Sequence, residues 1–118
     1  MFSQHQLGKE GELLARKFLE RQGFEIIITN WRHKHLEIDI IASHRNVLHI
    51  VEVKTQRITT AGFPEEQVSY EKFLNLQRAA ELFMNQYPHW SLLQFDIVSI
   101  TWSTHEEPEI LFIEDIWY

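Results

Sequence analysis

Two neighbouring stretches rich in β-branched residues constrain the fold most: residues 36–42 (LEIDIIA) and residues 47–54 (VLHIVEVK). Val and Ile favour strands, and the turn-like residues 43–46 (SHRN) between the stretches predict a β-hairpin. Each stretch also carries two charged residues at alternate positions: Glu37 and Asp39 in the first, Glu52 and Lys54 in the second. Because an unpaired buried charge costs more free energy than a small domain can spare, the hairpin must place these charges beside compensating groups.

Hydrophobic periodicity predicts the other elements of the fold. Apolar residues at helical spacing indicate helices over about residues 6–22 and 69–87. The inward stripe of the second helix is expected to be Phe73, Leu76, Ala80, Phe83 and Tyr87. Further strands are predicted at residues 24–30, 92–102 and 109–117, with residues 31–35 (WRHKH) as an exposed connection and residues 55–67 as a polar loop.

The order of these elements predicts an α/β (α+β) fold in a single domain over residues 1–118. The first three strands can form a meander, and a helical crossover can bring the fourth strand in parallel to the third. The expected architecture is a central mixed β-sheet flanked by helices, in the order αβββαββ.

Composition excludes several classes of protein. The chain has 118 residues, of which 44% are hydrophobic and 24% are charged, as in ordinary globular proteins. It has no cysteine, so disulfides and thiolate metal sites are excluded. No apolar run approaches the roughly 20 residues of a membrane span, and the N-terminal sequence lacks the cationic start and apolar block of a signal peptide. We therefore expect a cytoplasmic protein that does not bind membranes.

The distribution of charge bears on the choice of partner. A net charge of −6 argues against a protein that binds nucleic acid through bulk positive charge. All 11 Lys and Arg residues nevertheless lie in residues 1–78, alongside 10 acids. A cation-bearing face can therefore exist on this part of the fold, although charges scattered over a solvated surface explain the same distribution.

Alternation along the hairpin determines which charged side chains share a face. If the chain turns symmetrically about Arg45 and Asn46, Asp39 lies opposite Glu52 and Glu37 lies opposite Lys54. The second of these pairs reads as an ordinary cross-strand ion pair. The first brings two like charges together, so either one carboxylate is protonated or a cation lies between them.

Two carboxylates and water molecules form the kind of oxygen site that Mg²⁺ (or Mn²⁺) takes. Lys54 beside such a site can position a nucleophilic water or stabilise the negative charge that develops during phosphoryl transfer. Glu12, at the edge of the apolar stripe of the first helix, is a candidate further acid for the same site. Incidental ion pairs are the alternative explanation for these residues.

Further motifs run along the chain in a fixed order. They are GKEGELLARKFLERQGFEI (residues 8–26), NW (30–31), EIDIIA (37–42), VEVK (51–54), Lys72 and FD (95–96). Over about residues 8–100 they resemble the uncharacterised bacterial YraN-like family. That family looks like a branch of the PD-(D/E)XK, restriction-endonuclease-like superfamily. A helical Glu followed by D…ExK is also similar to the archaeal Holliday-junction resolvases.

The resemblance implies a restriction-endonuclease-like fold and the hydrolysis of a nucleic-acid phosphodiester. It implies that Asp39 and Glu52 are Mg²⁺ ligands, that Lys54 lies at the attacking water and that Glu12 is an auxiliary acid. Glu37 matches the acid of the family's Gly-Glu-Ile-Asp motif and is implied as a neighbour of the site.

Three residues depart from the family's pattern. Leu36 stands where the family has Gly, Gln56 replaces a basic residue after the EVK, and Gln94 replaces the Arg before FD. Losing two cations near the site weakens the expectation of tight binding to a phosphate backbone, because such binding depends on Lys and Arg.

Other side chains suggest contacts with nucleic acid. Candidate phosphate-binding cations are Arg32, Lys34, Arg57, Lys72 and Arg78. Trp31, Trp90, Trp102, Trp117 and Tyr118 have rings that stack on bases in single-strand binders, although packing within the protein is the more common use of such residues.

Three functions fit these features. The first is a Mg²⁺-dependent nuclease that acts on DNA, with branched or structured DNA implied by the similarity to the resolvases. The second is a non-catalytic nucleic-acid-binding module of the same fold within a larger DNA-processing assembly. The third is a metal-free α/β domain whose charges are structural. A homodimer is expected by analogy with enzymes of the superfamily that cut two strands.

Overall fold

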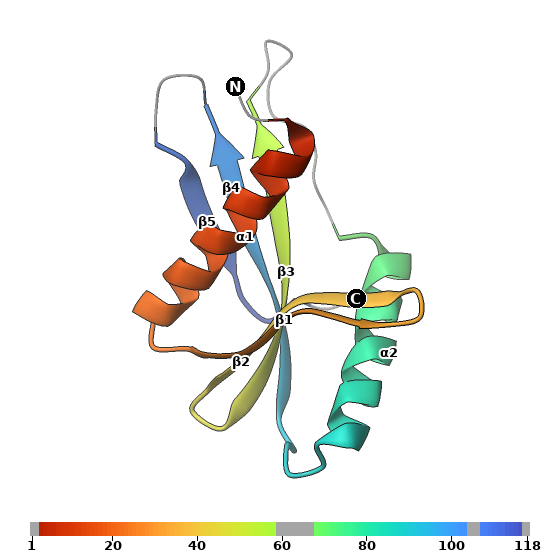
Figure 1. The fold of residues 1–118 in the computed structure, drawn as a ribbon. Helices are drawn as coiled ribbons and strands as arrows, with labels where there is room; N and C mark the ends of the chain where they lie inside the picture. Colours follow the sequence, from red (N-terminus) through yellow and green to blue (C-terminus); the bar gives the residue numbers. More distant parts are fainter. Residues whose placement is uncertain (1–2, 59–67, 104–106, 117–118) are drawn as a thin grey trace.

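The computed structural model describes residues 3–58, 68–103 and 107–116. Two helices and five strands follow one another in the order αβββαββ (Figure 1). Their bounds are α1 Gln4–Arg21, β1 Glu25–His33, β2 Leu36–His44, β3 Val47–Arg57, α2 Tyr70–Gln86, β4 Leu93–Trp102 and β5 Glu109–Ile113. The fold class and the order of elements that the sequence predicts are therefore confirmed. Within the described residues, neither helix combines the length and apolar character needed to cross a membrane.

The five strands form one mixed sheet in the order β1-β2-β3-β4-β5. Neighbouring strands are antiparallel except β3 and β4, which are parallel because α2 carries the chain from one end of the sheet back to the other. The β2–β3 hairpin turns at Arg45 and Asn46, whose positive φ angles of 51° and 67° are typical of a two-residue type I′ turn. Ile41 is thus opposite Ile50, which is the register that a symmetric turn predicts.

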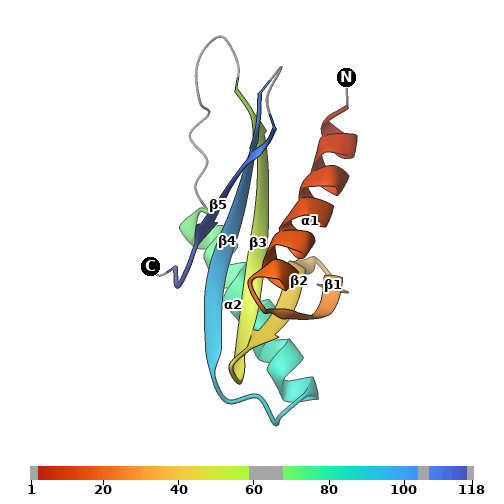
Figure 2. The same ribbon diagram turned by 90° about the vertical axis from the view of Figure 1, so that its left-hand side faces the viewer.

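The two helices lie on opposite faces of this sheet (Figures 1 and 2). One buried cluster joins Ala15 and Leu19 of α1 to Val51 of β3. A second cluster joins Leu76 of α2 to Ile50 of β3. Because side chains alternate along a strand, Glu52 and Lys54 lie on the α2 face of the sheet with Ile50.

Serine residues fix where both helices begin. Ser3 and Gln6 form a reciprocal capping box at the start of α1, with hydrogen bonds of 2.8 and 3.2 Å. The Ser69 hydroxyl accepts a hydrogen bond of 3.1 Å from the backbone N–H of Lys72 at the start of α2. This cap sets the position of Lys72 in the first turn of α2.

The structure corrects several element boundaries. Residues 31–33 belong to β1 instead of a connection, although Arg32 and His33 are exposed as predicted. Trp31 is only 9% exposed and packs edge-to-face on Phe83, with ring centroids 6.2 Å apart. Trp31 favours a strand, but the charged residues that follow it made the segment read as a connection. Tyr87 was wrongly placed in the core stripe, since it follows the last turn of α2 and is 48% exposed.

The other corrections concern strand ends. β3 continues to Arg57, so the predicted polar loop starts later than expected, and residues 59–67 of that loop lie outside the described part of the chain. The last strand ends at Ile113 instead of continuing to residue 117. The aromatic residues Trp117 and Tyr118 also lie outside the described residues.

Candidate active site

The candidate site lies where β2 separates from β3. Registered pairing between the two strands runs from His44–Val47 to Ile40–Val51. Figure 1 shows β1 and the beginning of β2 turning away from β3 and passing over α2. The Asp39 side chain lies at this separation, and its carboxylate accepts a hydrogen bond of 2.8 Å from the backbone N–H of Val53.

The symmetric hairpin predicted that Asp39 and Glu52 form a registered pair, but registered pairing ends one position earlier, at Ile40 and Val51. The two acids are nevertheless close enough for the charge of Glu52 to affect Asp39. The pKa of Asp39 is raised from 3.8 to about 7, chiefly by burial and next by the negative charge of Glu52. The hydrogen bond from the Val53 backbone lowers the pKa of Asp39, whereas the charges of Glu12 and Glu37 raise it. The predicted repulsion between the two carboxylates is thus present in the folded protein.

A lysine from α2 compensates the second carboxylate. The side chain of Glu52 is only 7% exposed, and its Oε1 lies 2.7 Å from Nζ of Lys72. Burial acts to lower the pKa of Lys72, but its contacts with Glu52 and Lys54 and the charge of Asp39 outweigh burial, so the pKa is raised above its ordinary value. The sequence placed Lys72 among the phosphate-binding candidates, and the structure places it within the acidic site.

The first helix brings Glu12 to the same region. A Cβ atom on Gly11 would lie 2.0 Å from Cγ2 of Thr55 in β3, so the backbone of α1 approaches this strand too closely for any side chain at that position. This close approach puts the half-buried Glu12 near enough to Asp39 for its charge to raise the Asp39 pKa. The prediction that Glu12 faces the site is consistent with this arrangement.

Glu37 behaves differently from the sequence-based expectation. It was paired with Lys54, but its Oε1 lies 3.3 Å from a guanidinium nitrogen of Arg32, which is its registered neighbour on β1. The separation of β2 from β3 explains the change, because β1 remains beside Glu37 when β3 does not. Lys54 itself is half-buried on the same face of β3 as Glu52.

The donor set suits a hard divalent cation with few protein ligands. Asp39 and Glu52 offer carboxylate oxygens, the ligands that Mg²⁺ prefers, and Mg²⁺ keeps several of its waters when bound. Over residues 3–58, 68–103 and 107–116, no group of three or more histidines and acids is placed to hold a metal ion. The remaining positions around an ion would therefore go to water or to substrate oxygens.

The other candidate contacts for nucleic acid are distributed over several elements. Arg32 and Lys34 are exposed at the end of the β1–β2 hairpin. Arg57 is half-buried at the end of β3. Arg78 is exposed on α2, where it donates a hydrogen bond of 3.4 Å to Asn75.

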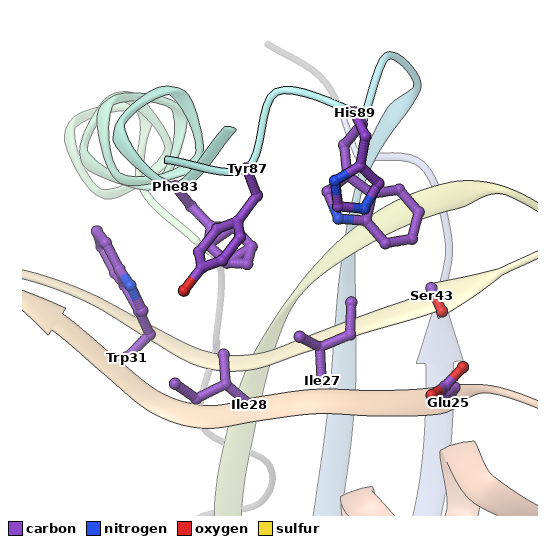
Figure 3. A pocket seen from close by; sticks show the side chains of 9 residues that line it. Glu25, Ile27, Ile28, Trp31, Ser43, Phe83, Tyr87 and His89 are labelled. Carbon is purple, nitrogen blue, oxygen red and sulfur yellow. The ribbon is translucent and has the colours of Figure 1, made fainter. Parts of the chain in front are cut away.

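An apolar cavity of about 330 Å³ lies between β1 and the end of α2 (Figure 3). Its lining includes Trp31, Phe83, Tyr87 and Trp90, and none of the candidate catalytic residues. Trp31 is buried in the core, and Trp90 packs partly buried against it. Packing within the protein, the more common use predicted for these aromatic residues, is confirmed for Trp31.

Sequence reasoning did not identify a buried polar network on the α1 face of the sheet. The fully buried Asp96 carboxylate lies 2.6 Å from Nδ1 of His49 and accepts hydrogen bonds from the Gln94 amide (2.9 Å) and the backbone N–H of Asp115 (3.0 Å). Gln94 therefore helps to hold a buried acid in place. The polar His49 between two apolar strand residues, Leu48 and Ile50, is the signal in the sequence that points to such a partner.

Comparison with known proteins agrees with the motifs. A family model described as "Uncharacterised protein family UPF0102" matches residues 11–100. A UPF0102 protein of Rhodococcus opacus (strain B4) is 38% identical over 110 residues, covering 92% of this chain and 93% of the relative. A UPF0102 protein of Flavobacterium psychrophilum is 36% identical over 118 residues, covering 100% and 98%. These matches confirm the resemblance to the YraN-like family, and the chain belongs to the UPF0102 family.

Proposed function

We propose that this protein is a divalent-metal-dependent nuclease that hydrolyses phosphodiester bonds of DNA. The observation that carries the proposal is the adjoining pair of carboxylates, the half-buried Asp39 and the buried Glu52, where burial and the charge of Glu52 together raise the pKa of Asp39 to about 7. Structural ion pairs also perturb pKa values, but here two acids converge with two lysines where two strands separate. Such a set fits hydrolysis of an anionic substrate better than it fits a purely structural role.

Each residue has a distinct part in this proposal. Asp39 and Glu52 would hold Mg²⁺, which supplies Lewis-acid stabilisation and a bound water of lowered pKa. The ammonium of Lys54 would orient the attacking water and stabilise the negative charge that develops on the phosphate oxygens. Glu12 would accept hydrogen bonds from water that enters the site from the α1 side.

The choice of DNA rests on the resemblance to the resolvase-like nucleases, and so does the preference for branched or structured DNA. The cations on the hairpin and on α2 support an anionic polymer as ligand, because Lys and Arg provide most contacts to phosphate backbones.

A cleavage assay tests the proposal. We expect the wild-type protein to cut at least one of linear duplex, single-stranded or four-way-junction DNA in the presence of Mn²⁺. Glu52→Gln and Lys54→Ala should each lower the rate by at least about 100-fold, because removing one preorganised electrostatic group at a reacting centre typically costs this much. Glu20→Gln, which neutralises an exposed acid of α1, should leave the rate unchanged.

The outcomes separate the functions. Cleavage that survives Glu52→Gln and Lys54→Ala would come from a contaminant and would overturn the catalytic assignment. Binding of DNA without cleavage would favour the second candidate, a non-catalytic nucleic-acid-binding module. The Glu52–Lys72 ion pair favours that candidate specifically, because it compensates one of the two acids without a metal ion.

A further inference from the structure

Lys72 pairs with a carboxylate that a metal ion would need. Its Nζ lies 2.7 Å from Oε1 of Glu52, which is one of the two carboxylates that the proposed function assigns to the metal. A buried carboxylate without a positive partner is strongly destabilising. The ammonium group therefore compensates the charge of Glu52 in the metal-free protein, as a divalent cation would in the metal-bound protein.

The two ends of this ion pair differ in exposure. The side chain of Glu52 is 7% exposed and is fixed within the sheet, whereas the side chain of Lys72 is 44% exposed. A lysine has a long flexible stem, so its ammonium group can leave a partner without moving the backbone that carries it. The Ser69 cap holds that backbone in the first turn of α2 in either state.

We propose that Lys72 is an exchangeable counter-cation, which leaves Glu52 when a divalent metal binds and then pairs with a phosphate oxygen of the substrate. This inference rests on the proposed function of the site. An ammonium group and a divalent cation on one carboxylate repel each other, so the two compete for Glu52. Once displaced, Lys72 is a mobile point charge on the α2 face beside Glu52 and Lys54, which is suited to a phosphate oxygen.

Exchange of this kind couples the two ligands of the site. A phosphate that pairs with the displaced ammonium removes the competitor for Glu52. The metal therefore binds more tightly when substrate phosphate is bound, and the phosphate binds more tightly when the metal is bound. By linkage the effect is reciprocal, and coupling between sites of this kind is typically about 5- to 150-fold. The free protein would accordingly hold metal weakly until DNA is present.

Calorimetric titration with Mn²⁺ tests the competition directly. Lys72→Met and Lys72→Gln, both without the competing charge, should bind Mn²⁺ about tenfold or more tightly than the wild type in the absence of DNA. The glutamine variant keeps a hydrogen-bond donor toward Glu52 and serves if the methionine variant does not fold. Lys17→Gln, which removes an exposed positive charge from α1 on the opposite face, controls for a general change in net charge.

A second titration tests the transfer to phosphate. A short single-stranded phosphorothioate oligonucleotide, which resists cleavage, should tighten Mn²⁺ binding to the wild type by about tenfold and should have a much smaller effect on Lys72→Gln. Titration of Mn²⁺ into the oligonucleotide alone provides the reference for metal held by the DNA itself.

The possible failures are distinguishable. If wild-type binding of Mn²⁺ depends on Glu52 but the Lys72 variants bind no more tightly than Lys17→Gln, the exchange is wrong and the proposed metal site stands. If the oligonucleotide has equal effects on wild type and Lys72→Gln, Lys72 does not pass to phosphate. If no variant binds Mn²⁺ with or without the oligonucleotide, or if binding persists in Glu52→Gln, the proposed metal site and the exchange both fail.

Discussion

Replacing Asp39 by asparagine is expected to stabilise the folded protein by about 2–4 kcal/mol near pH 8. The pKa of Asp39 is raised from 3.8 to about 7 by burial and by the charge of Glu52, so ionisation of this group opposes folding. Asparagine is nearly isosteric, carries no charge, and can still accept the hydrogen bond from the Val53 backbone. A substitution within the proposed active site should therefore make the protein more stable and inactive.

The dependence on pH follows from the direction of the shift. Below the unfolded pKa of 3.8, Asp39 is protonated in both states and makes no difference to stability. Between about pH 4 and pH 7 the unfolded chain loses this proton while the folded protein retains it, so the free energy of unfolding falls as pH rises. Above the folded pKa of about 7 both states are ionised, and the loss is complete and constant.

Urea denaturation from pH 4 to pH 8 measures this effect as the difference between wild type and Asp39→Asn, because other titrating groups cancel in the comparison. The difference should be near zero at pH 4 and should grow to its full size by about pH 8. Glu114→Gln, at an exposed position after β5, should show little such trend. A wild type that is more stable than Asp39→Asn at pH 8 without metal would show that Asp39 has a compensating partner that this account does not include.

Replacing Gly11 by alanine is expected to destabilise the protein by about 1–3 kcal/mol, the cost typical of overpacking. Alanine normally stabilises a helix interior relative to glycine by roughly 1 kcal/mol. At this position its Cβ would lie 2.0 Å from Cγ2 of Thr55. Threonine is short and stiff at χ1, so relieving the clash requires either an unfavourable χ1 rotation or a movement of α1 away from β3. Because Glu12 follows directly, the same movement would displace an acid of the proposed site.

Gly8→Ala provides a matched control in the same helix. No heavy atom lies within 4 Å of a Cβ built on Gly8, so this substitution should stabilise the protein by about 0.5–1 kcal/mol. Thr55→Ser removes the clashing methyl group, and the double variant Gly11→Ala/Thr55→Ser should recover most of the lost stability relative to Thr55→Ser alone. Equal denaturation midpoints for Gly11→Ala and Gly8→Ala would refute the close packing of α1 on β3.

The hairpin shows what local sequence can predict. Its register depends on a two-residue turn and on alternation, both of which are properties of adjacent residues, and Ile41 lies opposite Ile50 as expected. Alternation does not predict the point where β2 leaves β3, beyond which β2 stays paired with β1. The residues around Glu37 in the sequence do not indicate this change of partner. The sequence therefore predicted an ion pair with Lys54, whereas Glu37 pairs with Arg32.

The candidate site likewise combines features that adjacent residues predict with features that depend on tertiary packing. The motifs indicate that Asp39 and Glu52 belong together, because strand alternation alone brings them close. The ion pair between Lys72 and Glu52 depends on how α2 docks on the sheet, since 20 positions of sequence separate the two residues. Packing of Phe73 and Leu76 against the sheet core fixes that docking, and the sequence indicates only that these residues face inward.

Anomalous diffraction from wild-type crystals that contain a short phosphorothioate oligonucleotide and are soaked in millimolar Mn²⁺ tests the central claim most directly, because it locates the ion without reference to activity. We expect an anomalous peak about 2.1 Å from a carboxylate oxygen of both Asp39 and Glu52, with Nζ of Lys72 withdrawn from Glu52. A Lys72–Glu52 ion pair that remains in place, with no anomalous density between the two carboxylates, would contradict the assignment of this site to a divalent metal.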